Sequence, residues 1–288
     1  MRPSSHFAVA ACFLLVVSAA CVAETDRENA WSVLKQGLTN TNLEKRTKAA
    51  SDLALLPGNE QAFDAALTAL KDPKPEVRAA AAQALGELSN KRAIPELKKA
   101  LQDTDPAVLL SVARAMISLG DDDGYDVFYA VLTGQQKPNS SLLDQQKKVL
   151  SDPKKLAGLG FETGVGFVPF GGVALSAYKL FTKDETSPVL AGAALTLAKD
   201  PDPKSGEALA EAALNQKKWL VRAAAFQAIA KRGDPSLIHT AVLGLQDDQD
   251  EVQYAAAAAV IRLSDIESGH GEKPKPVQHT RRPAPSKQ

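Results

Sequence analysis

Apolar residues recur along this chain at a fixed spacing, at positions +0, +3, +4, +7, +8 and +11 of a repeated segment. One copy places Val77, Ala80, Ala81, Ala84, Leu85 and Leu88 at these positions, and the copy that begins at Val252 follows the same pattern. The spacing puts the apolar side chains on one stripe of an α-helix. No alternating run rich in Val, Ile or Thr indicates a β-strand. The pattern therefore predicts an all-α protein.

The helical segment recurs about every 31 residues. Its equivalent positions are Lys45, Val77, Val108, Leu142, Val189, Val221 and Val252. A shorter helix is expected before several of these segments, over residues 93–101, 124–132, 205–213 and 235–245. Asp105-Pro106 and Ser187-Pro188 mark two helix starts, each with a capping side chain before a first-turn proline. Because a helical hairpin cannot bury its apolar faces alone, seven units are predicted to stack into a solenoid.

The residues that begin the second unit, Asp72-Pro-Lys-Pro-Glu-Val-Arg-Ala-Ala-Ala-Ala-Gln-Ala-Leu-Gly86, carry a family resemblance. With Ala93-Ile-Pro-Glu-Leu97 they resemble the bacterial HEAT repeat, also called the phycobilisome-lyase-like repeat, and the likeness extends over roughly residues 26–266. The resemblance implies an α-α superhelix whose Val-Arg helices line the concave face, with an Asp/Arg pairing between neighbouring repeats. The matching arginines are Arg46, Arg78 and Arg222, whereas Leu109, Leu190 and Gln253 occupy that place in other copies. Arg78, Arg114 and Arg222 are candidate partner-binding residues.

The middle of the chain interrupts the repeat. The step from Leu142 to Val189 exceeds one repeat by about 16 residues, which separates units 1–4 (26–151) from units 5–7 (172–266) by an insertion at 152–171. The stretch 163–178 is uncharged and rich in glycine, and the insertion carries Phe161, Phe167 and Phe170. Three interpretations stay open: a loop folded back on the solenoid, a contact with a protein partner, and a membrane contact.

Residues 1–23 have the layout of a secretory signal peptide, with an early Arg2, a short apolar run and small residues before the expected cleavage site. Val17-Ser18-Ala19-Ala20-Cys21 also resembles a loose lipobox, in which Cys21 would be lipidated, although Ser18 stands where lipoproteins usually carry Leu. The chain is therefore expected to be exported, either periplasmic or secreted, or held at a membrane as a lipoprotein.

The C-terminal tail 267–288 mixes proline, lysine and arginine with almost no apolar residues, and is expected to be disordered. A solvated end and attraction to an anionic envelope polymer or membrane are the two interpretations of its basic character.

Candidate chemistry is sparse. Lys+Arg and Asp+Glu both number 34, which gives no net charge to favour a nucleic-acid partner. Both cysteines lie in the first 21 residues, and no set of side chains assembles a metal site, a cofactor site or a nucleophile with its base. The sequence predicts a non-catalytic scaffold that binds an unidentified protein or peptide. The alternatives are a lipid-anchored envelope protein and, from the resemblance alone, a bilin lyase.

Overall fold

A computed structural model describes residues 24–133 and 186–271, and every regular element in these two ranges is helical. The expected residues Cys21, Phe161, Phe167 and Phe170, the insertion 152–171 and most of the tail lie outside the described residues. No helix in the two described ranges is both long and apolar enough to cross a membrane.

The long helices carry the predicted apolar stripe. After a first helix over residues 24–38 come α2 (Leu43–Asp52), α4 (Pro75–Glu87), α6 (Pro106–Ser118), α11 (Thr186–Leu197), α13 (Trp219–Arg232) and α15 (Asp250–Glu267). Val77 and Leu85 are 1% and 0% exposed, which confirms the stripe in the second unit. Asp105 accepts hydrogen bonds from the N–H groups of Ala107 and Val108, and confirms the predicted cap of α6. The helix α11 begins at Thr186, so Ser187 and Pro188 lie in its first turn.

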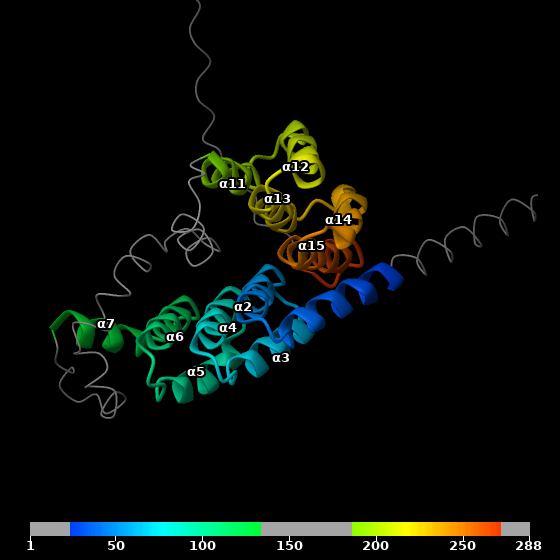
Figure 1. The fold of residues 1–288 in the computed structure, drawn as a ribbon. Helices are drawn as coiled ribbons and strands as arrows, with labels where there is room; N and C mark the ends of the chain where they lie inside the picture. The colour runs from blue at the N-terminus through cyan, green and yellow to red at the C-terminus, as the bar shows by residue number, and fades with distance from the viewer. Residues whose placement is uncertain (1–23, 134–185, 272–288) are drawn as a thin grey trace, which may run out of the picture.

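Shorter helices alternate with the long ones, close to the predicted ranges. They are α3 (Glu60–Ala69), α5 (Ile94–Ala100), α7 (Gly124–Thr133), α12 (Pro203–Asn215) and α14 (Ile238–Leu243), with 3₁₀ turns at Leu53–Leu55, Lys91–Ala93, Pro235–Leu237 and Gly244–Gln246. Figure 1 shows α2, α4, α6, α13 and α15 side by side as an inner layer, with α3, α5, α12 and α14 outside it.

The order of the units in space differs from their order in the sequence. α15 packs against α2, so the array runs α11, α13, α15, α2, α4, α6 (Figure 1). The first helix 24–38 also lies against α15, because a Cβ on Gly37 would come within 2.7 Å of Tyr254 as well as of Ala49. The N-terminal and C-terminal halves therefore meet in the middle of the solenoid, which the repeat pattern did not predict.

Polar side chains hold this junction together. Arg27 Nη2 lies 3.0 Å from Asp265 Oδ1, and Asn59 Nδ2 donates to Asp265 Oδ2 at 2.6 Å. Arg262 donates to the carbonyl oxygen of Pro57 at 3.1 Å. Further along the junction, Gln227 Nε2 donates to Asp52 Oδ1 at 2.9 Å, and Lys45 pairs with Asp250 at 2.5 Å. Each of these contacts joins one half of the chain to the other.

Candidate interaction surface

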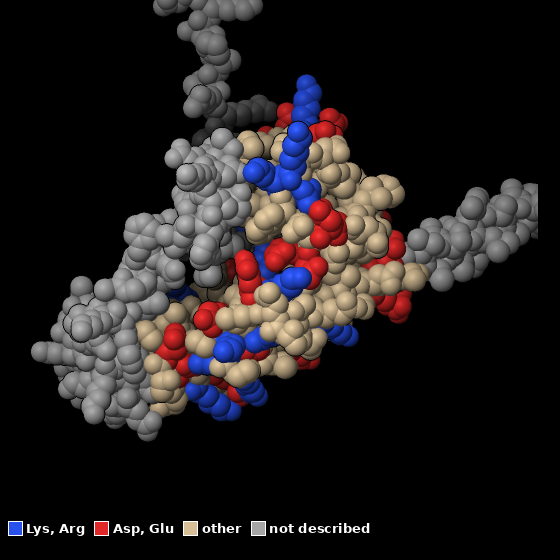
Figure 2. Space-filling model, in the orientation of Figure 1, with Lys and Arg blue, Asp and Glu red and all other residues tan. Residues whose placement is uncertain are grey.

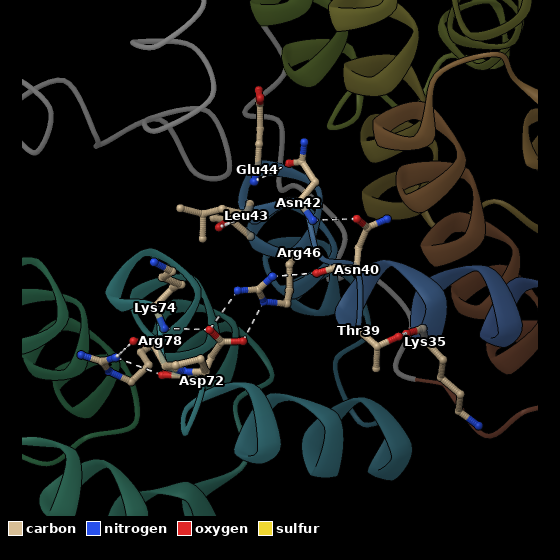
Figure 3. Close-up of polar contacts among 12 residues, drawn as sticks. Lys35, Thr39, Asn40, Asn42, Leu43, Glu44, Arg46, Asp72, Lys74 and Arg78 are labelled. Carbon is tan, nitrogen blue, oxygen red and sulfur yellow. Dashed lines mark hydrogen bonds and ion pairs between the residues drawn. The ribbon is translucent and has the colours of Figure 1, made fainter.

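An Arg–Asp ladder runs along the edge of the array where the long helices begin. Arg46, Arg78 and Arg222 each stand in the first turn of a long helix and each bind the aspartate that precedes the next long helix, namely Asp72, Asp103 and Asp247. The Arg78 pair is bidentate, with Nε 2.6 Å from Asp103 Oδ2 and Nη2 2.9 Å from Asp103 Oδ1. The pairing that the family resemblance implied is present in these three units. Figure 3 shows the pair of Arg46 and Asp72.

The arginine of each of these pairs also binds the backbone of the turn that precedes its own helix. Arg46 Nη1 donates to the carbonyl of Asn40, six residues earlier, and Arg78 does the same to Asp72 (Figure 3). Gln253, which replaces arginine in the last unit, keeps only this second role and donates to the carbonyl of Asp247 at 2.6 Å. A neutral residue therefore preserves the turn in the last unit while giving up the ion pair to its neighbour.

Two of the ladder aspartates, Asp72 and Asp247, are held in their ionised form. Burial by itself raises the pKa of the Asp72 carboxyl, but hydrogen bonds from Arg46 and from the Lys74 N–H outweigh it and keep this pKa below its ordinary value of 3.8. The pKa of Asp247 is lowered in the same way, against its own burial, by Arg222 and the Gln249 N–H. Two of the ladder's carboxylates thus favour folding only while they are charged.

Acid is therefore expected to weaken the solenoid through these rungs. Because the folded pKa of Asp72 and Asp247 is lowered, their contribution is fully present above the ordinary pKa of 3.8 and is lost as pH falls below it, through the lowered folded value. Urea unfolding followed across this range should show a smaller pH dependence in the double variant Asp72→Asn, Asp247→Asn than in the parent. The exposed Asp64→Asn is the matched control, and an unchanged pH dependence in the double variant would contradict the assignment.

The inner faces of α4 and α6 form the exposed surface beside the ladder. Glu76, Gln83 and Glu87 project from α4 and Arg114 from α6, all four exposed. Within the described part of the chain, Glu76 and Gln83 make no hydrogen bond or ion pair, and the Arg114 guanidinium lies 6.0 Å from the Phe128 ring. On the face drawn in Figure 2, acidic and basic side chains are interspersed with uncharged ones.

The predicted arginines thus have different surroundings. The Arg78 and Arg222 side chains are 19% and 12% exposed and are bound to aspartates of neighbouring units, whereas Arg114 is open to solvent. A role for any of the three in partner binding stays a prediction.

Sequence reasoning did not single out Asp52, although its position in the repeat offered a signal. Asp52 stands at position +7 of its unit, where other units carry Ala84, Ala228 and Ala259.

One lysine of the inner layer has an unusual proton affinity. Burial lowers the pKa of Lys231, near the end of α13, to about 8, with Glu87 acting against this shift and Lys199 adding to it. At pH 8 about half of its amine is neutral, which exceeds the neutral fraction of an ordinary lysine on the order of a hundredfold. Glu87 acts on this amine from α4, although two long helices separate α4 from α13 in the array.

Lys231 is accordingly expected to react early with a limiting amount of an amine-acylating reagent at pH 8. Peptide mass spectrometry should find its labelled fraction above that of Lys204, an exposed lysine of α12. Raising the pH to about 11 should remove most of the difference, since both amines are then largely neutral. Labelling of Lys231 that trails Lys204 at both pH values would contradict the lowered pKa.

The described residues contain no group of three or more His, Cys, Asp or Glu side chains placed to hold a metal ion. Glu76, Gln83, Glu87 and Arg114 offer exposed hydrogen-bonding groups along the packed helices α4 and α6.

Comparisons with known proteins agree with this architecture. The family model of HEAT repeats matches residues 31–117, 63–139 and 176–261. An uncharacterized phycocyanin operon protein Z of Pseudanabaena tenuis is 33% identical over 106 residues, which covers 34% of this chain and about half, 52%, of that relative.

Three solved structures are also similar. Human deoxyhypusine hydroxylase in complex with glycerol is 16% identical, with a TM-score of 0.32, over 83% of this chain and 97% of that one. The complex of CpcE and CpcF of the phycocyanin lyase from Nostoc sp. PCC7120 is 20% identical, with a TM-score of 0.31, over 81% of this chain and 92% of that one. An engineered protein is 19% identical, with a TM-score of 0.26, over 84% of this chain and 97% of that one. The family model of HEAT repeats matches well over half of the residues of this chain. The chain therefore belongs to the HEAT repeats family.

Proposed function

We propose that this protein is an interaction scaffold that binds a protein or peptide along the inner faces of its long helices. The supporting observation is that Glu76, Gln83 and Arg114 are exposed on a well-packed helical layer and form no ion pair within the described residues. Solenoids present extended concave surfaces of this kind to their partners. Because α4 and α6 are fixed by a buried apolar core, a partner would meet hydrogen-bonding groups that are already in place.

Site-specific photocrosslinking tests this proposal. A photoreactive residue in place of Gln83 is expected to give a discrete adduct in cells, and one in place of Arg114 should capture the same partner. Thr68, exposed on the outer helix α3, is the matched control position. Adducts that form equally at Thr68, or none at either inner position, would contradict binding at the inner surface.

We further propose that the scaffold works outside the cytoplasm. The support is the signal-peptide layout of residues 1–23 and the cysteine at position 21. Mass measurement of the mature N-terminus distinguishes cleavage before Cys21 from cleavage before Glu24. If Cys21 is lipidated, Cys21→Ser should move the protein from the membrane fraction to the soluble fraction. An uncleaved protein in the cytoplasm would rule out export.

A bilin-handling activity is the second candidate, favoured by the likeness to a phycocyanin operon protein. Purified protein would then shift the visible absorption of an added bilin, and an apo-phycobiliprotein would gain covalently bound pigment only in its presence. An unchanged absorption spectrum in both mixtures would contradict a bilin-handling activity and would leave the scaffold proposal standing.

A further inference from the structure

The junction in the middle of the solenoid joins the first and the last described elements of the chain. Helix 24–38 and α2, from the N-terminal half (24–133), lie on one side, and α15, from the C-terminal half (186–271), lies on the other (Figure 1). No short turn connects the two sides, since the rest of the chain lies between α2 and α15. The junction is therefore held by non-covalent contacts alone.

The Arg–Asp ladder does not cross the junction. In a continuing ladder, a first-turn arginine of α15 would bind an aspartate in the turn before α2. Gln253 stands at the arginine's place, and Asn40 stands at the place that Asp72 and Asp247 fill in other units. All three ladder pairs lie within one half of the chain. The contact between α15 and α2 is therefore built differently from the ladder contacts within each half.

The centre of the junction is closely packed. The backbone of helix 24–38 comes so near that a Cβ on Gly37 would lie 2.7 Å from Ala49 of α2 and 2.7 Å from Tyr254 of α15. Ala49 is fully buried, and Tyr254 is 3% exposed. The 3₁₀ turn Leu53–Leu55, which follows α2, also contacts α15 and α13 with buried side chains.

The charges at the edge of the junction are complementary. Two ion pairs cross it among the described residues, Arg27 with Asp265 and Lys45 with Asp250, and in both the cation belongs to the N-terminal half. Their side chains are between 11% and 34% exposed. A buried apolar centre inside a charged rim is the usual anatomy of an interface between two proteins. Opposite charges on its two sides let each half select the other and disfavour a second copy of itself.

We propose that the junction is a recognition interface that also forms between two copies of this chain, with the N-terminal half of each copy bound to the C-terminal half of the other. Such an exchanged dimer has the junction contacts of the closed monomer, so the two forms differ in which chain supplies each half. The covalent connection holds one half near the other at an effective concentration on the order of a millimolar, so the closed monomer dominates in dilute solution. The exchanged dimer carries two inner surfaces in one particle.

Two variants with mismatched junction charges test this exchange. The first is Arg27→Asp with Lys45→Asp, and the second is Asp265→Arg with Asp250→Lys. Either variant alone places like charges across its own junction. An exchanged dimer of the two restores opposite charges at one junction and leaves the other as in the parent. After the two are unfolded together in urea and refolded at micromolar concentration, the dimer is expected to exceed that of either variant alone by about tenfold or more.

The matched control is Arg92→Asp mixed with Glu60→Arg. This exposed ion pair lies within the N-terminal half, so its variants should stay monomeric both alone and mixed. Size-exclusion chromatography with light scattering measures the dimer. If a junction variant alone loses its helical circular dichroism, the mixture must regain it together with the dimer. A junction mixture without a dimer overturns the proposal, and so does an equal amount of dimer in the control mixture.

The parent chain provides a second test without mismatched charges. Copies with two different affinity tags are unfolded together and refolded, and particles that hold both tags are expected to become common as the concentration approaches about one millimolar. Tagged copies that all carry Arg27→Asp and Lys45→Asp should lose these particles, because like charges then face each other in the exchanged dimer as well. Particles with both tags that persist in this variant, or none in the parent at any concentration, overturn exchange at the junction.

Discussion

Replacing Asp52 by alanine is expected to lower the free energy of unfolding by about 3–5 kcal/mol. The Asp52 side chain is fully buried, and its carboxylate accepts from Lys48 Nζ at 2.5 Å and from Gln227 Nε2 at 2.9 Å. Without it, the largely buried ammonium of Lys48 and the amide of the buried Gln227 both lose this acceptor. Urea unfolding followed by circular dichroism measures the loss.

The matched control is Asp64→Ala, which removes an exposed carboxylate from α3 and should change stability by less than about 0.5 kcal/mol. A double-mutant cycle between Asp52→Ala and Gln227→Ala isolates the contact between the two halves, and a coupling of about 0.5–3 kcal/mol is expected. A loss below about 1 kcal/mol in Asp52→Ala would show that the junction does not depend on this carboxylate.

Replacing Gly244 by alanine is the second change with a large expected effect. An added Cβ would lie 2.3 Å from the ring of Phe226 and 2.7 Å from Ala256, and the Phe226 side chain is fully buried. Because a packed core cannot absorb a methyl group at such distances, we expect a loss of at least about 1–3 kcal/mol. Thermal unfolding should show a correspondingly lower Tm.

Gly192→Ala is the matched control, since it adds the same methyl group to α11 with no other atom within 4 Å. Alanine is the better helix former, so this variant is expected to gain about 0.4–1 kcal/mol. The two substitutions should therefore shift Tm in opposite directions. Equal shifts would show that helix propensity, and not the close approach of Gly244 to Phe226, sets the outcome.

Much of the local structure could be predicted from the sequence. The apolar stripe on the long helices, the cap at Asp105 and the short helix near 124–132 all depend on interactions within a few residues, and the structure confirms them. The ladder was predictable as well, through the family resemblance, because Arg78 and Asp103 are only 25 residues apart and recur with the repeat.

The candidate surface was predicted only in part. Gln83 and Gln227 occupy the same place of the repeat, six residues after Val77 and Val221, yet Gln83 is exposed while Gln227 is 6% exposed and bonded to Asp52. No local pattern separates the two glutamines. Their surroundings differ because α13 contacts the 3₁₀ turn Leu53–Leu55 that follows α2, and this contact brings Gln227 to Asp52.

The sequence by itself therefore determined that this protein is a stack of helical hairpins, where its helices begin, and which arginines tie neighbouring units together. Only the tertiary structure decided the order of the units in space, with the last unit against the first. The physical reason is that the alanine-rich faces of the units are nearly interchangeable, so a repeat pattern does not specify which unit is the neighbour of which. That choice depends on pairs such as Arg27–Asp265 and Asp52–Gln227, whose members lie 238 and 175 residues apart and meet only in the folded chain.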